Sequence, residues 1–330
     1  MINPEVRSPR LEVRGSKPEF PGQAAAFSLV ELLTVMALLS VIILGLMAMF
    51  TQTQRAFRTG MSQTDVLESG RVVTDLIARD LSQISPNYVA RSFGAPNFYE
   101  VLMGAFPLPL PGVAPDVFRT NFMDDVFFVV RKNQSWSGIG YFVRTNLDGL
   151  NANTGVGTVG TLYRFETNAS LTEFQQNPSR LLTAWSRARV QTNYPGVSRI
   201  LDGVVSFSIR PRDDQGWVFT NNPVWQFKSP SLVVNSNLQV VLRSSGRVIA
   251  GSFLTVQLPG AELYLLGFYS NSVPASVEFQ LGILEQQAFD RYKGIPIFQS
   301  QTNYLASQAA RVHLFRQLIA VPNVDPAAYQ

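Results

Sequence analysis

The sequence predicts an α+β protein in which one long N-terminal α-helix precedes a head built mainly of antiparallel β-strands. Residues 27–84 contain no proline and hold apolar side chains at helical spacing. Residues 85–330 hold short apolar stretches separated by Gly, Asn, Pro and Asp, which is typical of strands joined by turns. At 330 residues, the chain has room for one or two domains with a sizeable core.

The first half of the expected helix, residues 27–50, is long and apolar enough to cross a membrane. Residues 32–50 carry no charge, and a bilayer core of about 30 Å needs about 20 apolar residues. No small-x-small cleavage site follows the apolar run, so an ordinary secretory signal is a poor fit. The polar leader, residues 1–26, has four basic residues, Arg7, Arg10, Arg14 and Lys17. Basic flanks favour the cytoplasm, so the C-terminal part is expected to cross the membrane.

The second half of the helix, residues 51–84, is expected to be amphipathic. Its apolar residues recur mostly at spacings of three, four or seven: Val66, Leu67, Val73, Leu76, Ile77, Leu81 and Ile84. These positions drift too much for a strict heptad, which favours packing on a sheet over a coiled-coil linker. Ser85-Pro86 then supplies a stop, because proline restricts the residue before it. A continuous helix over residues 27–84 would be about 87 Å long.

The head, residues 85–330, is predicted to be rich in short strands after a proline-rich loop at 85–121. Asp213-Asp214-Gln215-Gly216 has the composition of a turn. Residues 229–272 look like an insertion, with a hairpin of Leu232–Leu242 and Val248–Leu258 and a further strand at Leu263–Tyr269. The other predicted strands are Val126–Arg131, Ile139–Arg144, Thr161–Glu166, Val204–Arg210, Trp217–Thr220, Ala275–Leu284 and Val312–Val321.

Glu31 is the one charged residue of the apolar segment 27–50. A charge inside a bilayer is costly, so an acid at this place is by default a functional residue. The simplest alternative is a carboxylate at the helix end that reaches the lipid headgroups. A buried carboxylate otherwise needs a partner of opposite charge.

The hexapeptide Phe27-Ser28-Leu29-Val30-Glu31-Leu32 resembles the N-terminus of type IV prepilins and type II secretion pseudopilins. The resemblance implies that a prepilin peptidase cuts between Ala26 and Phe27 and methylates the new amine of Phe27. The family usually has Gly where this chain has Ala26. In a staggered helical bundle, Glu31 of one subunit would then meet the Phe27 amine of its neighbour and set the register between subunits. The implied fold is the pilin lollipop, with the helix as its stem.

Shorter pieces in the rest of the chain resemble the minor pseudopilin J subfamily of type II secretion. They are Arg71 with residues 75–81, residues 139–144 with 162–164, residues 201–210 with Asp213, Gly216 and Trp217, and residues 274–279. The chain is also similar to the pilin-like proteins of the Verru_Chthon cassette, in particular protein C. The resemblance implies a structural subunit that primes, caps or decorates a short periplasmic filament. Its partners would be the prepilin peptidase, other pilins or pseudopilins, and the inner-membrane assembly platform.

Three functions stay open at this point. The first is a minor pseudopilin, placed at the filament tip because a bulky head is hard to stack along a shaft. The second is a minor type IV pilin whose head is an adhesin or receptor. The third is an unprocessed single-pass membrane protein with a periplasmic binding domain. All three place the chain in a bacterial inner membrane with its head in the periplasm.

Catalysis is not expected from this composition. The chain has no cysteine, which removes disulfides, thiolate chemistry and cysteine-ligated zinc, and its one histidine, His313, falls on the polar face of a predicted strand. GxSxG, P-loop and HExxH motifs are absent. The net charge is +4 without a run of five basic residues, so no nucleic-acid partner is expected. No cofactor is expected either, although Asp213 and Asp214 could join a calcium site instead of forming a plain turn.

Overall fold

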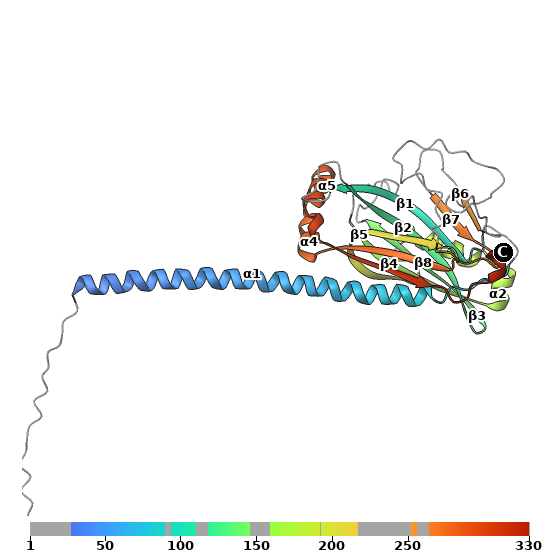
Figure 1. Ribbon diagram of the computed structural model, residues 1–330, viewed down its shortest axis with the longest axis horizontal. Coiled ribbons are helices and arrows are strands. Elements are labelled where there is room, and N and C mark those ends of the chain that lie inside the picture. Colours follow the sequence, from blue (N-terminus) through green and yellow to red (C-terminus); the bar gives the residue numbers. More distant parts are fainter. Residues whose placement is uncertain are drawn as a thin grey trace, which may run out of the picture. The chain divides into compact units, whose positions relative to one another are not determined.

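The computed structural model describes residues 28–89, 94–109, 118–145, 159–191, 193–216, 252–255 and 264–329 (Figure 1). The chain divides into two compact units, residues 1–57 and 58–330, and each is described by itself. Its elements are one long N-terminal helix, a large and mainly antiparallel sheet, and several short helices, so the predicted α+β class is confirmed.

Helix α1 spans Leu29–Leu81 and begins directly after Ser28. The Glu31 backbone N–H donates to the Ser28 hydroxyl (3.2 Å) and to the Ser28 carbonyl oxygen (3.0 Å). A serine at this place satisfies one of the N–H groups that the first helical turn leaves without an intrahelical acceptor. The carboxylate of Glu31 lies in the first turn, where the helix dipole favours negative charge.

The helix ends three residues before the predicted end at Ile84, because the chain leaves it to join the sheet. Ile84 forms an isolated bridge with Val130 of strand β2 (Phe118–Lys132). The next backbone N–H, that of Ser85, donates to the carbonyl oxygen of Val129 (3.1 Å). These bonds need an extended backbone, which the last predicted turn of helix cannot provide.

Nine strands form one sheet in the described ranges, in the order β6-β7-β1-β2-β3-β4-β5-β8-β9. Every pair of neighbours in this order is antiparallel. The remaining strands are β1 (Phe98–Pro109), β3 (Ser135–Thr145), β4 (Gly160–Ser170), β5 (Val197–Arg212), β6 (Ser252–Thr255), β7 (Tyr264–Phe268), β8 (Ser276–Leu284) and β9 (Val312–Ala320).

Most predicted strands are confirmed. Strands β2, β3, β4 and β5 each extend beyond a predicted stretch, β8 and β9 are each one residue shorter than theirs, and β7 lies inside Leu263–Tyr269. Strand β6 lies inside Val248–Leu258 and pairs with β7. The predicted strands Trp217–Thr220 and Leu232–Leu242 lie outside the described residues. The turn at residues 213–216 is confirmed, with Gly216 at a positive φ of 83°.

The prediction of a loop over residues 85–121 is wrong for its middle part, where β1 runs as a twelve-residue strand. Residues 98–102 of β1 pair with β7 on one side and with β2 on the other. From Gly104 onward, the only partner of β1 among the described residues is β2, and Pro107 and Pro109 fall in this part. Proline is tolerated where a strand has a free edge, because its missing N–H removes no ladder bond there.

Four short helices were not predicted. Helices α2 (Leu171–Gln176) and α3 (Arg180–Ala188) follow β4, whereas α4 (Gln286–Lys293) and α5 (Phe298–Ser307) follow β8. Figure 1 places α4 and α5 together at one end of the sheet and α2 at the other. The start of α2 had a sequence signal, because Ser170 and Glu173 form a capping box.

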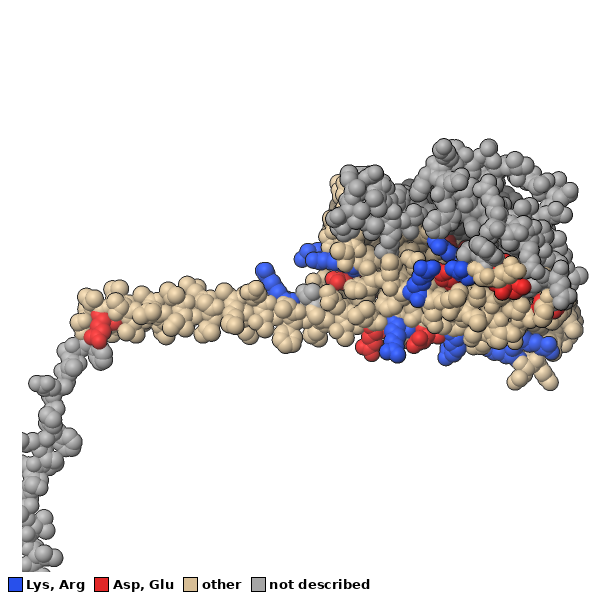
Figure 2. Space-filling model, in the orientation of Figure 1, with Lys and Arg blue, Asp and Glu red and all other residues tan. Residues whose placement is uncertain are grey.

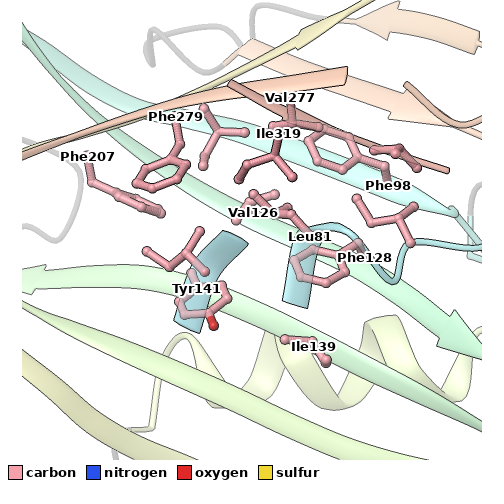
Figure 3. Close-up of a cluster of buried hydrophobic side chains, with 14 of the residues drawn as sticks. Leu81, Phe98, Val126, Phe128, Ile139, Tyr141, Phe207, Val277, Phe279 and Ile319 are labelled. Carbon is pink, nitrogen blue, oxygen red and sulfur yellow. The ribbon is translucent and has the colours of Figure 1, made fainter. Parts of the chain in front are cut away.

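The largest core lies between the C-terminal part of α1 and one face of the sheet (Figure 3). Leu81 of α1 points among side chains from β1, β2, β3, β5, β8 and β9, including Phe98, Phe128 and Phe279. Val66, Val73, Ile77 and Leu81 of α1 are all buried in this core. The part of α1 from Val66 onward therefore packs on the sheet, although Leu67, which the predicted apolar stripe included, is exposed.

A second core lies on the other side of β2, β3 and β4, where α2 and α3 cover it. Leu181, Trp185 and Ala188 of α3 are buried there at helical spacing. Gly140 of β3 leaves room for the Trp185 ring, since a side chain at that position would overlap it. Phe174 of α2 stacks on Trp136 with ring centroids 5.1 Å apart.

Candidate assembly site

The apolar half of α1, Leu29–Phe50, forms no part of a core. Each of its residues is exposed, and α1 is long and apolar enough here to cross a membrane. Figure 2 shows this end of the helix without basic residues and with acidic atoms only near its beginning. Such a long, uncovered apolar surface needs a lipid or protein environment, because exposed apolar patches of this size are rare on soluble monomers.

Glu31 is the one carboxylate on this surface. Its side chain is exposed in the first turn of α1, two residues after the helix begins. The backbone around it is already ordered by side chains, because Thr34 Oγ1 donates to the Glu31 carbonyl oxygen (2.9 Å) and Ser28 accepts from the Glu31 N–H. The Glu31 side chain therefore lies exposed in the first turn of α1, where the apolar segment begins. A positively charged group of another molecule can reach it there.

The role of Ser28 was not predicted, although the sequence held a signal for it. Ser28-Leu29-Val30-Glu31 has the S-x-x-E spacing of a helix N-terminus. The two predicted processing residues, Ala26 and Phe27, lie outside the described residues.

A buried charge cluster joins the end of α1 to the sheet. The Asp80 carboxylate accepts hydrogen bonds from the Tyr141 hydroxyl of β3 and from Arg164 Nε of β4, both at 2.7 Å. Asp80 is 3% exposed, and its bond to Tyr141 is buried, whereas its bond to Arg164 is partly buried. Burial, followed by the neighbouring Asp80, raises the pKa of Tyr141, which keeps its hydroxyl a donor.

The cluster continues outward to the surface. Arg164 Nη1 donates to Glu166 (2.7 Å), which also accepts from Lys132 Nζ (3.0 Å). Burial alone would lower the pKa of Arg164, but hydrogen bonds to Asp80 and Glu166 raise it overall. Sequence reasoning missed this cluster. The available signal was the position of Asp80 itself, which falls on the apolar stripe next to Ile77 and Leu81.

The two acids considered for calcium, Asp213 and Asp214, differ in exposure. Asp213 is buried, and its Oδ1 accepts from the Gln215 N–H (3.0 Å), as expected in a turn. Asp214 is exposed. Within the described ranges, no three His, Asp or Glu side chains gather as metal ligands would.

His313 is half-buried on β9, where the prediction placed it on a polar face. Its Nε2 lies 3.2 Å from Glu285 Oε1, at the junction of β8 and α4. The histidine thus has a buried carboxylate as its neighbour instead of open solvent.

Comparison of the chain with protein-family models, with curated proteins and with solved structures found no match.

Proposed function

We propose that the chain is a structural subunit of a pilus-like filament, in the role of a minor pseudopilin that acts by assembly after residues 1–26 are removed. The observation that carries the proposal is the uncovered apolar segment Leu29–Phe50 with a single carboxylate in its first turn. The expected prepilin cleavage site lies directly before this segment. The proposed fold is accordingly the pilin lollipop, with α1 as stem and the nine-stranded sheet as head.

Before assembly, the apolar segment would hold the subunit in the inner membrane, with the head in the periplasm. During assembly, the same surface would exchange lipid for the stems of neighbouring subunits. Its apolar character suits both surroundings, and Glu31 adds selectivity because a charge in an apolar bundle needs an opposite charge. The Phe27 amine of a neighbour, created by the prepilin peptidase, would supply it. The inner-membrane assembly platform would then extract the subunit.

Glu31→Leu is expected to insert into the membrane normally but to enter filaments at least about tenfold less than the unaltered chain. Its neighbour's amine would be left buried without a partner, and a loss of only about 1.4 kcal/mol gives a tenfold change. The measurement is the ratio of the chain in sheared filaments to that in membranes.

Two matched variants sharpen this experiment. Glu31→Asp keeps the charge and should restore much of the incorporation, whereas Glu68→Leu makes the same change at an exposed site on the same helix and should have little effect. N-terminal analysis of every variant should find a chain that begins at methylated Phe27. Normal incorporation of Glu31→Leu would contradict the assembly role, and retention of residues 1–26 would favour an unprocessed membrane protein.

The head suits a filament end better than a shaft. Residues 58–330 form one compact unit, and bulky heads are hard to repeat closely along a filament. Immunogold labelling of the head is expected only at filament ends. Gold particles along the whole filament would instead indicate a shaft subunit, and labelling of long surface pili would favour an adhesin-bearing minor pilin.

A further inference from the structure

Strands β2 and β5 meet directly, although the sheet order also connects them through β3 and β4. Within the described residues, β2 pairs with β3 from Val126 onward, and the part of β2 before Val126 pairs with β1 and also reaches β5. There, Met123 and Phe207 form the single bridge of a parallel contact. This contact, which we call the β2–β5 seam, closes strands β2, β3, β4 and β5 into a ring. Only one pair of backbone partners joins β2 to β5 in the described residues.

Side chains supply the hydrogen bonds that the backbone ladder lacks in this seam. Asp124 Oδ2 of β2 accepts from the Ile209 N–H of β5 (2.8 Å). In the other direction, the Phe122 N–H of β2 donates to the Ser206 hydroxyl of β5 (3.3 Å). The Asp124 carboxylate therefore accepts from a backbone N–H of β5 where a sheet ordinarily uses a backbone carbonyl oxygen. Unlike a carbonyl oxygen, a carboxylate changes its charge when it binds or releases a proton.

Asp124 is held in unusual surroundings for an acid. It is 3% exposed, and burial raises its pKa from the ordinary 3.8 to about 7, against the hydrogen bonds from Ile209 and Ser208. Arg210 of β5 lowers this pKa in part, and the adjacent Asp125 raises it. When Asp124 is ionised in the closed head, it keeps its bond to Ile209 but lacks most of the hydration that it would have in water. Ionisation therefore lowers the free energy needed to reach a state in which Asp124 is exposed to water.

The other charged groups near the seam do not cancel this effect. On β1, Glu100 has its pKa raised well above the ordinary value by burial first and by Asp124 second, so each of these two acids disfavours ionisation of the other. Asp125 is engaged elsewhere, since it accepts from Arg189, which follows α3 (2.6 Å), and lies 3.9 Å from Arg144 of β3. Arg210 also lies over the Phe122 ring, 5.4 Å from its centroid.

We propose that the β2–β5 seam is a proton-sensitive closure of the head, shut while Asp124 is neutral and loosened when Asp124 ionises. The direction follows from proton binding. The closed state binds the Asp124 proton more tightly than the open, hydrated state, so closure is most stable at low pH and weakens as pH rises toward and through 7. With the two pKa values above, the opening constant should rise about tenfold between pH 6 and pH 8. This inference is independent of the proposed assembly function.

Amide hydrogen exchange of the full chain in detergent micelles tests the seam. After correction for intrinsic exchange, the Phe122 and Ile209 amides should lose about tenfold in protection from pH 6 to pH 8. Asp124→Asn keeps an oxygen acceptor and removes the titration, so protection should become nearly independent of pH. Asp214→Asn, the same change on an exposed turn, should keep the pH dependence of the unaltered chain.

Ser208→Ala provides a second variant if Asp124→Asn does not fold. It removes a hydrogen bond that lowers the pKa of Asp124, so the loss of protection should move to higher pH. The proposal is overturned if the unaltered chain shows constant protection at these two amides. It is equally overturned if Asp124→Asn keeps the original slope, or if Ser208→Ala leaves the transition where it was.

Discussion

Asp80→Ala is expected to lower the free energy of unfolding by about 3–5 kcal/mol, the usual cost of removing one member of a buried ion pair. The substitution leaves Arg164 Nε and the Tyr141 hydroxyl without their common acceptor in the interior. Part of the Arg164 charge stays compensated by Glu166, which places the expected loss toward the lower end of this range. Urea unfolding of the full chain in detergent, followed by tryptophan fluorescence, measures the change.

The appropriate control is an acid on the same helix that touches nothing in the interior. Asp75 is exposed, so Asp75→Ala should change stability by less than about 0.5 kcal/mol. Tyr141→Phe removes one of the two bonds to Asp80 and should cost about 1 kcal/mol. Equal effects of Asp75→Ala and Asp80→Ala would mean that the cluster contributes no more than a surface charge.

Gly196→Ala is expected to cost about 3 kcal/mol or more, from two causes that act together. Gly196 precedes β5 with φ at 86°, a conformation that side chains rarely adopt, at a cost of about 1–3 kcal/mol. A Cβ atom there would also overlap the backbone carbonyl oxygen of Glu166, whose own N–H donates to the Gly196 carbonyl oxygen (2.9 Å). Relief of such overlap costs about 1–3 kcal/mol more.

Gly216 separates these two causes. Its φ of 83° is almost the same, but a Cβ atom there meets no atom of the described residues within 4 Å. Gly216→Ala should therefore show the conformational cost alone, and the difference between the two variants measures the steric cost. If both variants lose the same stability, the carbonyl of Glu166 is not a steric barrier.

The strands were predictable because burial of one face of a pleated sheet places apolar residues at alternate positions of the sequence. In β8, apolar Val277, Phe279, Leu281 and Ile283 alternate with other residues, and all four are buried in one core. The helix α1 was predictable for a similar reason, since its apolar run and lack of proline are visible without any tertiary contact. Its end was not, because the pairing of Ile84 with Val130 is a tertiary event.

The short helices and the interior charge cluster escaped prediction for two different reasons. Helix α2 has only six residues, too short for a periodic pattern to stand out from the surrounding strands. The bond between Asp80 and Arg164 joins residues 84 apart in the chain, so no local pattern could reveal it. Glu31 was easier to single out, because a lone charge in an apolar run needs no knowledge of the fold.

The serine before α1 has a consequence for maturation. Ser28 and Glu31 both lie on the C-terminal side of the expected cut, so the hydrogen bonds from the Glu31 N–H to Ser28 join two residues that the mature chain would keep. If the proposed cut is made, the mature chain would retain this capped helix start. Cleavage would also replace a neutral peptide link by a cationic terminus on Phe27, two residues before α1 begins.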